Sequence, residues 1–183
     1  YCISYGWLSV AIETITGNTL NEILKKYLCD PFNLANTSFN RDKLSKTNLA
    51  PFYFKDTEGK YSDISIKITL SYNPFQYVRE RMTASLSNYL NILQLFLQNI
   101  ESFCARNTIT KMFKNQIGHF DIPLLRSYNQ SLSLDYKVYP NVKKSWEYGP
   151  LISGQLPAHR GSGRSDSRAG VLNTYFRINH KNN

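Results

Sequence analysis

The chain opens with the sequence YCISYGWLSVAIETI (residues 1–15), followed by TGNTL (residues 16–20). Apolar side chains recur in it every three or four residues, which predicts an amphipathic helix; they are Trp7, Leu8, Ala11, Ile12 and Ile15. Gly17 and Asn18 predict where this helix stops, because both residue types favour backbone conformations that end helices. Tyr1 stands at the start of the helix, where its hydroxyl is a candidate for a chemical role.

A second helix is expected immediately afterwards. Thr19 and Glu22 have the spacing of a capping box, in which the threonine hydroxyl accepts the Glu22 amide and the carboxylate reaches back. Pro31 lacks a backbone donor and predicts the end of the helix. The apolar side chains expected to lie on its buried face are Leu20, Ile23, Leu24, Tyr27 and Leu28.

The middle of the chain contains the strongest helical pattern. Ser85 or Ser87 can cap a helix whose apolar face would be Leu86, Tyr89, Leu90, Leu93, Phe96, Leu97 and Ile100. A shorter helix is expected near residues 108–115. Before these helices, Ile64, Ile66 and Ile68 alternate with polar residues, which predicts a short strand.

After Pro140 the pattern changes to β-type segments. One strand is expected around residues 146–152 and another over 170–178, with a Gly/Ser/Arg loop over 159–167. Helices first and strands last predict an α+β fold. The length of 183 residues favours one domain, with a helical part at about 1–135 and sheet strands at about 144–180.

Composition limits the function classes. The 22 Lys and Arg against 13 Asp and Glu give a formal charge of +9, but no nucleic-acid motif accompanies the charge, so a solvated basic surface is the favoured interpretation. The three cysteines have neither disulfide-framework nor zinc spacing, and no metal or cofactor is expected. No apolar run is long enough to predict a membrane span. The richness in Asn, Lys, Ile and Tyr is typical of AT-rich coding and suggests a bacterial source.

Five segments, in order along the chain, resemble motifs of the serine β-lactamase-like superfamily. This superfamily includes class C β-lactamases, penicillin-binding proteins and related esterases and transesterases. The opening resembles its Tyr-Ser-x or Tyr-x-Asn helix, and RAGVLNTYFRI resembles its Trp-Ala-Gly-x-x-Asn-Thr-Tyr-Phe-Trp-Ile strand. The segments are residues 1–39, 86–95, 108–117, 144–149 and 168–178.

The resemblance implies part of a β-lactamase/transpeptidase-like fold, with a helical subdomain and a few antiparallel strands. It implies that Tyr1 relays a proton during acyl transfer, since a phenol can do so when nearby cations lower its pKa. It places Arg168, Ala169, Gly170 and Val171 on the strand that lines the site, with the Val171 amide as an oxyanion donor. It also implies that this strand is a sheet edge in the present chain.

The nucleophile of this superfamily is the serine of a Ser-x-x-Lys helix upstream of the tyrosine. No serine of this chain has a lysine three residues later. The chain is therefore expected to be a C-terminal portion of a serine hydrolase and to be inactive alone. The substrate of an intact parent would be a small ester, amide or β-lactam.

Two departures from the motifs bear on substrate. Ile3 replaces the asparagine of the lactamase element, which favours an esterase over a β-lactamase. Arg168 replaces the tryptophan of the esterase branch, and it either pairs with a substrate carboxylate or is a solvent-facing residue without a role.

Two other functions stay open. The first is a non-catalytic module that binds peptidoglycan or peptides with the same fold. The second is a basic protein that binds nucleic acid or a membrane surface, which salt-sensitive binding would reveal.

Overall fold

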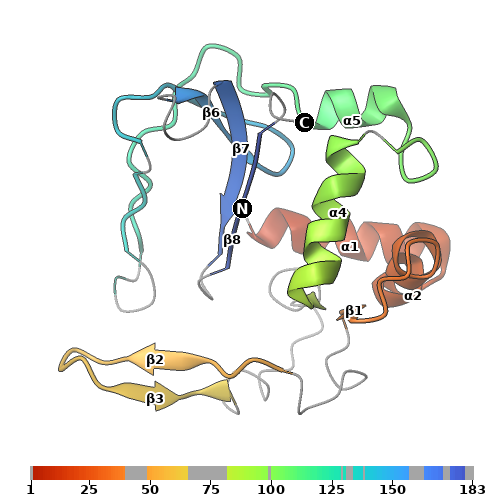
Figure 1. Ribbon diagram of the computed structural model, residues 1–183, viewed down its shortest axis with the longest axis horizontal. Helices are drawn as coiled ribbons and strands as arrows, with labels where there is room; N and C mark the ends of the chain where they lie inside the picture. The colour runs from red at the N-terminus through yellow and green to blue at the C-terminus, as the bar shows by residue number, and fades with distance from the viewer. Residues whose placement is uncertain are drawn as a thin grey trace. The chain divides into compact units, whose positions relative to one another are not determined.

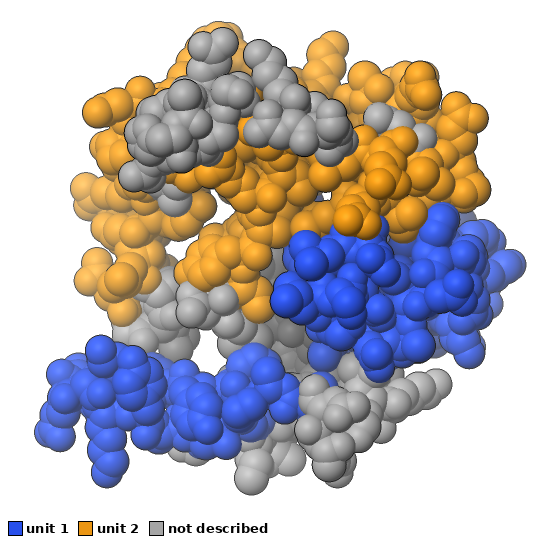
Figure 2. Space-filling view, viewed as in Figure 1, with its two compact units in different colours: residues 1–92 blue, residues 93–183 orange. Residues whose placement is uncertain are grey.

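The computed structural model divides the chain into two compact units, residues 1–92 and 93–183 (Figure 2). The residues that it describes are 2–39, 49–65, 82–98, 100–128, 130, 134–137, 139–156, 163–170 and 174–179. Each unit contains antiparallel strands of its own (Figure 1), and the boundary between the units falls within one helix, α4 (Leu86–Leu97). The α+β class expected from the sequence is confirmed. None of the helices within the described ranges has the length and apolar character needed to cross a bilayer.

The first helix forms as expected but does not bury the expected face. Helix α1 (Cys2–Thr16) ends at Gly17, whose φ of +66° suits a residue without a side chain. However, Trp7 and Ile15 are 65% and 83% exposed, whereas Ser9 is buried. The Ser9 hydroxyl satisfies itself within the helix by donating to the Gly6 carbonyl at 2.8 Å. Among the described side chains of α1, the buried residues are therefore Gly6 and Ser9, and most of the predicted apolar stripe is exposed.

The second helix changes geometry halfway along. Helix α2 (Leu20–Leu24) starts with the predicted capping box: the Glu22 amide donates to Thr19 Oγ1 at 3.3 Å, and the Thr19 amide donates to the Glu22 carboxylate at 2.8 Å. It runs into the π-helical turn η1 (Lys25–Cys29), in which the Asp30 amide donates to the Lys25 carbonyl five residues back. The wider turn changes which side chains face inward, so Tyr27 is exposed, contrary to the prediction.

The core of the first unit forms where this segment meets two short strands. Strand β1 (Thr37–Ser38) pairs with β4 (Thr83–Ala84), and Leu34 beside it is fully buried. Helix α4 (Leu86–Leu97) then begins with Ser85 Oγ accepting the Asn88 amide, one of the two predicted caps. The buried residues of α4 are Asn88 and Ile92, while Leu86 and Leu90 of the predicted apolar face are exposed.

Asn88 is buried because it has a partner: its amide donates to Thr37 Oγ1 at 3.2 Å. A separate hairpin in the same unit consists of β2 (Tyr53–Lys55) and β3 (Tyr61–Asp63). The strand predicted from the alternating isoleucines lies mostly outside the described residues, since only Ile64 is described.

The second unit contains helix α5 (Arg106–Met112) and one four-stranded sheet (Figure 1). Its strands pair antiparallel in chain order and are β5 (Lys144–Trp146), β6 (Leu151–Leu156), β7 (Gly163–Ala169) and β8 (Tyr175–Asn179). Among the described strands, β8 is the last in the order, so it forms an edge. The apolar core residues of this sheet are Leu151, Ile152 and Ile178.

Three parts of this sheet differ from the prediction. Residues 146–152 were expected as one strand, but they contain the end of β5, a turn and the start of β6. Residues 163–167 were expected in a loop because they are small and polar, yet they belong to β7. Residues 170–178 were expected as one strand, but the strand starts at Tyr175. The polar segment forms a strand because β6 and β8 pair with it on both sides and because Arg164 forms ion pairs with Asp166 and Glu147.

Candidate functional site

Three of the site residues expected from the sequence, Arg168, Ala169 and Gly170, lie at the end of β7 and in the turn towards β8. Arg168 and Ala169 are the last two residues of β7, opposite Phe176 and Tyr175 of β8. Gly170 follows directly, and its amide donates to the Thr174 carbonyl at 2.9 Å, which closes the hairpin. Tyr1 and Val171 lie outside the described residues, so the proton relay and the oxyanion donor stay predictions.

Gly170 is at a place where a side chain does not fit. A Cβ atom built on it would lie 2.8 Å from Thr174 Oγ1. This distance is well below van der Waals contact, so either the threonine or the hairpin would have to move. The hairpin therefore depends on a glycine here, through a close approach rather than through a left-handed backbone.

Arg168 is held by the protein itself. Its guanidinium lies over the Trp146 ring, 5.9 Å from the centroid, which is within the range of a cation–π contact. It also donates to the Gly149 carbonyl at 3.4 Å. Arg168 is half-buried and ties the turn after β5 to the end of β7. Its use by a substrate carboxylate stays a prediction.

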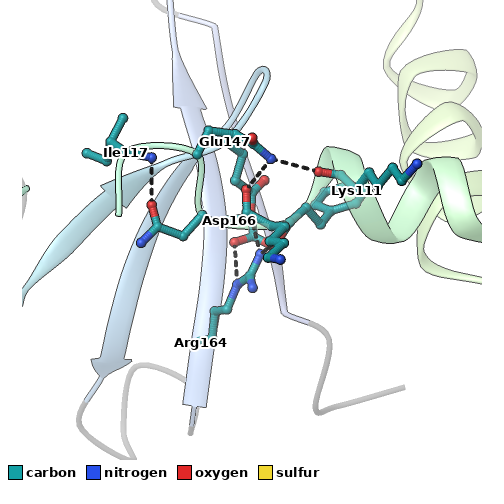
Figure 3. Close-up of polar contacts among 9 residues, drawn as sticks. Lys111, Ile117, Glu147, Arg164 and Asp166 are labelled. Carbon is teal, nitrogen blue, oxygen red and sulfur yellow. Dashed lines mark hydrogen bonds and ion pairs between the residues drawn. The ribbon is translucent and has the colours of Figure 1, made fainter. Parts of the chain in front are cut away.

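A second polar cluster lies further back along β7 and was not predicted from the sequence. Arg164 donates to the carboxyls of Glu147 and Asp166 and to the Phe113 carbonyl at the end of α5 (Figure 3). The Arg164–Asp166 ion pair measures 3.1 Å. Both acidic side chains are completely buried, whereas the Arg164 side chain is 41% exposed. The guanidinium thus covers two carboxyls that have no access to water.

Burial is the main cause of a raised pKa in this cluster. Loss of solvent, and then the negative charge of Asp166, raise the pKa of Glu147 to about 8, although Arg164 opposes the shift. A glutamate with this pKa keeps its proton at neutral pH and can act as a hydrogen-bond donor. Its Oε2 atom is buried and has no hydrogen-bond partner, and the neighbouring Asp166 carboxyl could accept a hydrogen bond from Oε2 when that atom carries a proton.

The segment after α5 is fastened to the sheet beside this cluster. The Gln116 amide donates to the Trp146 carbonyl of β5 at 2.8 Å. The Gln116 side chain donates to the carbonyls of Lys111 and Lys114, and Asn115 Oδ1 accepts the Ile117 amide (Figure 3). These contacts place the end of α5 over Arg164.

The cluster gave only a faint sequence signal. Arg164, Asp166 and Arg168 alternate with serines, a period-two pattern that places all three on one face of a strand. Glu147 lies 17 residues before Arg164, and nothing local links it to that face. Within the described ranges, no three His, Cys, Asp or Glu side chains gather as a possible metal site.

Comparison with known proteins shows the fold. No protein-family model and no curated protein matches the sequence. A mutant of simvastatin synthase (LovD) from Aspergillus terreus matches 96% of this chain with a TM-score of 0.76 and 17% identity, over 45% of its own length. A penicillin-binding protein homologue from Pyrococcus abyssi, described as octameric, matches 95% of this chain with a TM-score of 0.66 and 19% identity, over 34% of its length. A penicillin-binding protein from Bacillus halodurans matches 89% with a TM-score of 0.55 and 10% identity, over 40% of its length.

The chain therefore has part of the β-lactamase/transpeptidase-like fold, as the resemblance of its motifs predicted. It spans less than half the length of each of these three solved chains.

Proposed function

We propose that this chain contributes the tyrosine helix and the oxyanion strand of a serine acyl-transferring enzyme, which acts on ester, amide or β-lactam carbonyls. The observation that carries the proposal is the match over 96% of the chain to simvastatin synthase, together with the order of the five sequence motifs. Both place the chain on a scaffold on which penicillin-binding proteins are also built.

The proposed chemistry needs an activated serine, a proton relay and two amide donors for the oxyanion. In this proposal Tyr1 relays the proton, and the Val171 amide is one oxyanion donor. Arg168, Ala169 and Gly170 form the wall along which the substrate lies. The closed hairpin at Gly170 supports this arrangement, because it fixes the backbone immediately before Val171.

The 183 residues contain no Ser-x-x-Lys, so they are expected to form no acyl-enzyme by themselves. The first test incubates the purified chain with nitrocefin, a chromogenic ester and a fluorophosphonate. We expect no hydrolysis above background and no adduct by mass spectrometry. A stoichiometric adduct on any serine of the chain would overturn the proposal.

The second test uses the upstream coding sequence. The proposal expects an in-frame Ser-x-x-Lys there, and the extended protein should form a fluorophosphonate adduct on that serine. Tyr1→Phe removes only the relay hydroxyl and should lower the rate of acylation by roughly two orders of magnitude or more. Tyr27→Phe is the matched control, since Tyr27 is 63% exposed and lies in a different turn. Equal rates for the two variants would exclude Tyr1 as the relay.

A further inference from the structure

Glu147 and Asp166 are two acids that share one cation in a buried place. Each carboxyl side chain has no exposed surface, and Arg164 binds both of them. If both acids were ionised, Arg164 would face two negative charges away from water and could balance only one of them, which is costly. A single proton removes this charge.

Glu147 has a place for that proton. Its Oε1 atom accepts from Arg164, while its Oε2 atom is buried without a hydrogen-bond partner. An ionised carboxylate with a buried, unpartnered oxygen is unfavourable. Protonation turns Oε2 into a donor, and the neighbouring Asp166 carboxylate can then accept its hydrogen bond.

Among the described residues, Asp166 and Arg164 are the charged groups that set the protonation state of Glu147. On β6 and β8 the residues opposite Asp166 are Ile152 and Ile178, which do not titrate. The segment after α5 contributes the Phe113 carbonyl, and the ammonium group of Lys111 points away from the cluster (Figure 3). Further along β7, the Arg168 guanidinium is directed to Trp146 and Gly149.

We propose that Glu147, Asp166 and Arg164 form a proton-operated clasp. The clasp is closed when Glu147 carries a proton. It then ties the end of α5 and the turn after β5 to the middle of β7. When the proton leaves, two carboxylates compete for one guanidinium, and the same guanidinium must still hold the Phe113 carbonyl. The turn after β5 is tied to β7 at two points, Glu147 and Gly149, and only the first depends on a proton. The clasp does not rest on the proposed enzymatic function.

The sign of the pH effect follows from proton linkage. The pKa of Glu147 is raised in the folded chain, from 4.5 to about 8, so the folded state binds a proton that the unfolded state has lost. The stabilisation is complete below about pH 4.5 and is lost as the pH rises towards 8. Between about pH 5.5 and 7.5, the unfolding equilibrium constant should rise roughly tenfold per pH unit from this one group.

The test measures urea unfolding of the full chain from pH 5.5 to 8.5 for the wild type, Glu147→Gln and Glu101→Gln. Glutamine keeps the shape of the protonated acid, including a donor towards Asp166 and an acceptor for Arg164, and it does not titrate. We expect Glu147→Gln to lose the tenfold-per-unit dependence and to be more stable than the wild type at pH 8.5. Glu101 is exposed, so Glu101→Gln should keep the wild-type dependence. A Glu147→Gln profile with the wild-type slope would refute the clasp.

A second measurement does not depend on the variant folding. The chain has six glutamates, and carbon-13 labelling of their carboxyls allows each to be titrated by NMR in the wild type. One resonance should titrate above pH 7. Hydrogen exchange of the Gln116 backbone amide, which donates to the Trp146 carbonyl of β5, should become faster over the same pH range by more than the usual effect of hydroxide. Six resonances that all titrate below pH 6 would overturn the proposal.

Discussion

Replacement of Gly170 by alanine tests whether the β7–β8 hairpin depends on a close approach of atoms. The new Cβ would lie 2.8 Å from Thr174 Oγ1, and its next neighbour, the Thr174 carbonyl oxygen, would lie at an ordinary 3.6 Å. Among the atoms of the described residues, one therefore causes the conflict. Threonine is branched at Cβ and has restricted rotamers, so the hydroxyl cannot move away freely. Overpacking of this kind costs about 1–3 kcal/mol.

The double variant separates this clash from any backbone effect. Thr174→Ala removes the one atom of the described residues that is in conflict, and Gly170 is not among the residues with a left-handed backbone. In the Thr174→Ala background, Gly170→Ala should therefore be neutral or should stabilise the chain by about 0.4–1 kcal/mol, because alanine restricts the unfolded chain. The predicted change of sign between the two backgrounds is the central result.

The assay is urea unfolding followed by circular dichroism for the wild type, both single variants and the double variant. The interaction energy from the four stabilities should be at least about 1 kcal/mol. If Gly170→Ala costs the same in both backgrounds, the contact with Thr174 is not the reason for the glycine, and a backbone requirement would have to replace it.

Three further changes test individual contacts. Leu34→Ala should lower the free energy of unfolding by about 2–5 kcal/mol, because Leu34 is fully buried and leaves a cavity; a loss below about 1 kcal/mol would mean that the first unit lacks a packed core there. Thr19→Ala should cost about 1 kcal/mol by removing the capping box, while Thr19→Ser should cost much less, and equal losses would contradict the role of the hydroxyl. Tyr175→Lys should reduce self-association of the chain, measured by light scattering, because Tyr175 is 64% exposed on the edge strand β8 and lysine discourages strand pairing. Unchanged light scattering would show that self-association does not occur through this edge.

The parts of the fold that were predicted correctly have local causes. The end of α1 at Gly17, the capping box at Thr19 and the cap of α4 at Ser85 each depend on residues within one helical turn. The ordered motifs predicted the fold class for the same reason, since each motif is a short segment of sequence.

The errors arise where distant segments decide the outcome. Residues 163–167 look like a loop, and become a strand because β6 and β8 pair with them on both sides. Asn88 is buried in place of the predicted leucines because Thr37, 51 residues away, offers it a partner. The shared proton of Glu147 depends on a contact with β7 that no local pattern encodes.

The π-helical turn at Lys25–Cys29 bears on how this segment tolerates changes in length. A hydrogen bond from Asp30 back to Lys25 encloses one residue more than an α-helical bond would. The turn is therefore equivalent to an α-helix with a single residue inserted, and relatives that lack this residue would run through the same stretch as a regular helix. Deletion of Lys26 should then be absorbed by conversion of the turn to an α-helix, whereas the same deletion within α4 would rotate Asn88 away from Thr37. The position most permissive for insertion and deletion would thus lie inside a helix rather than in a loop.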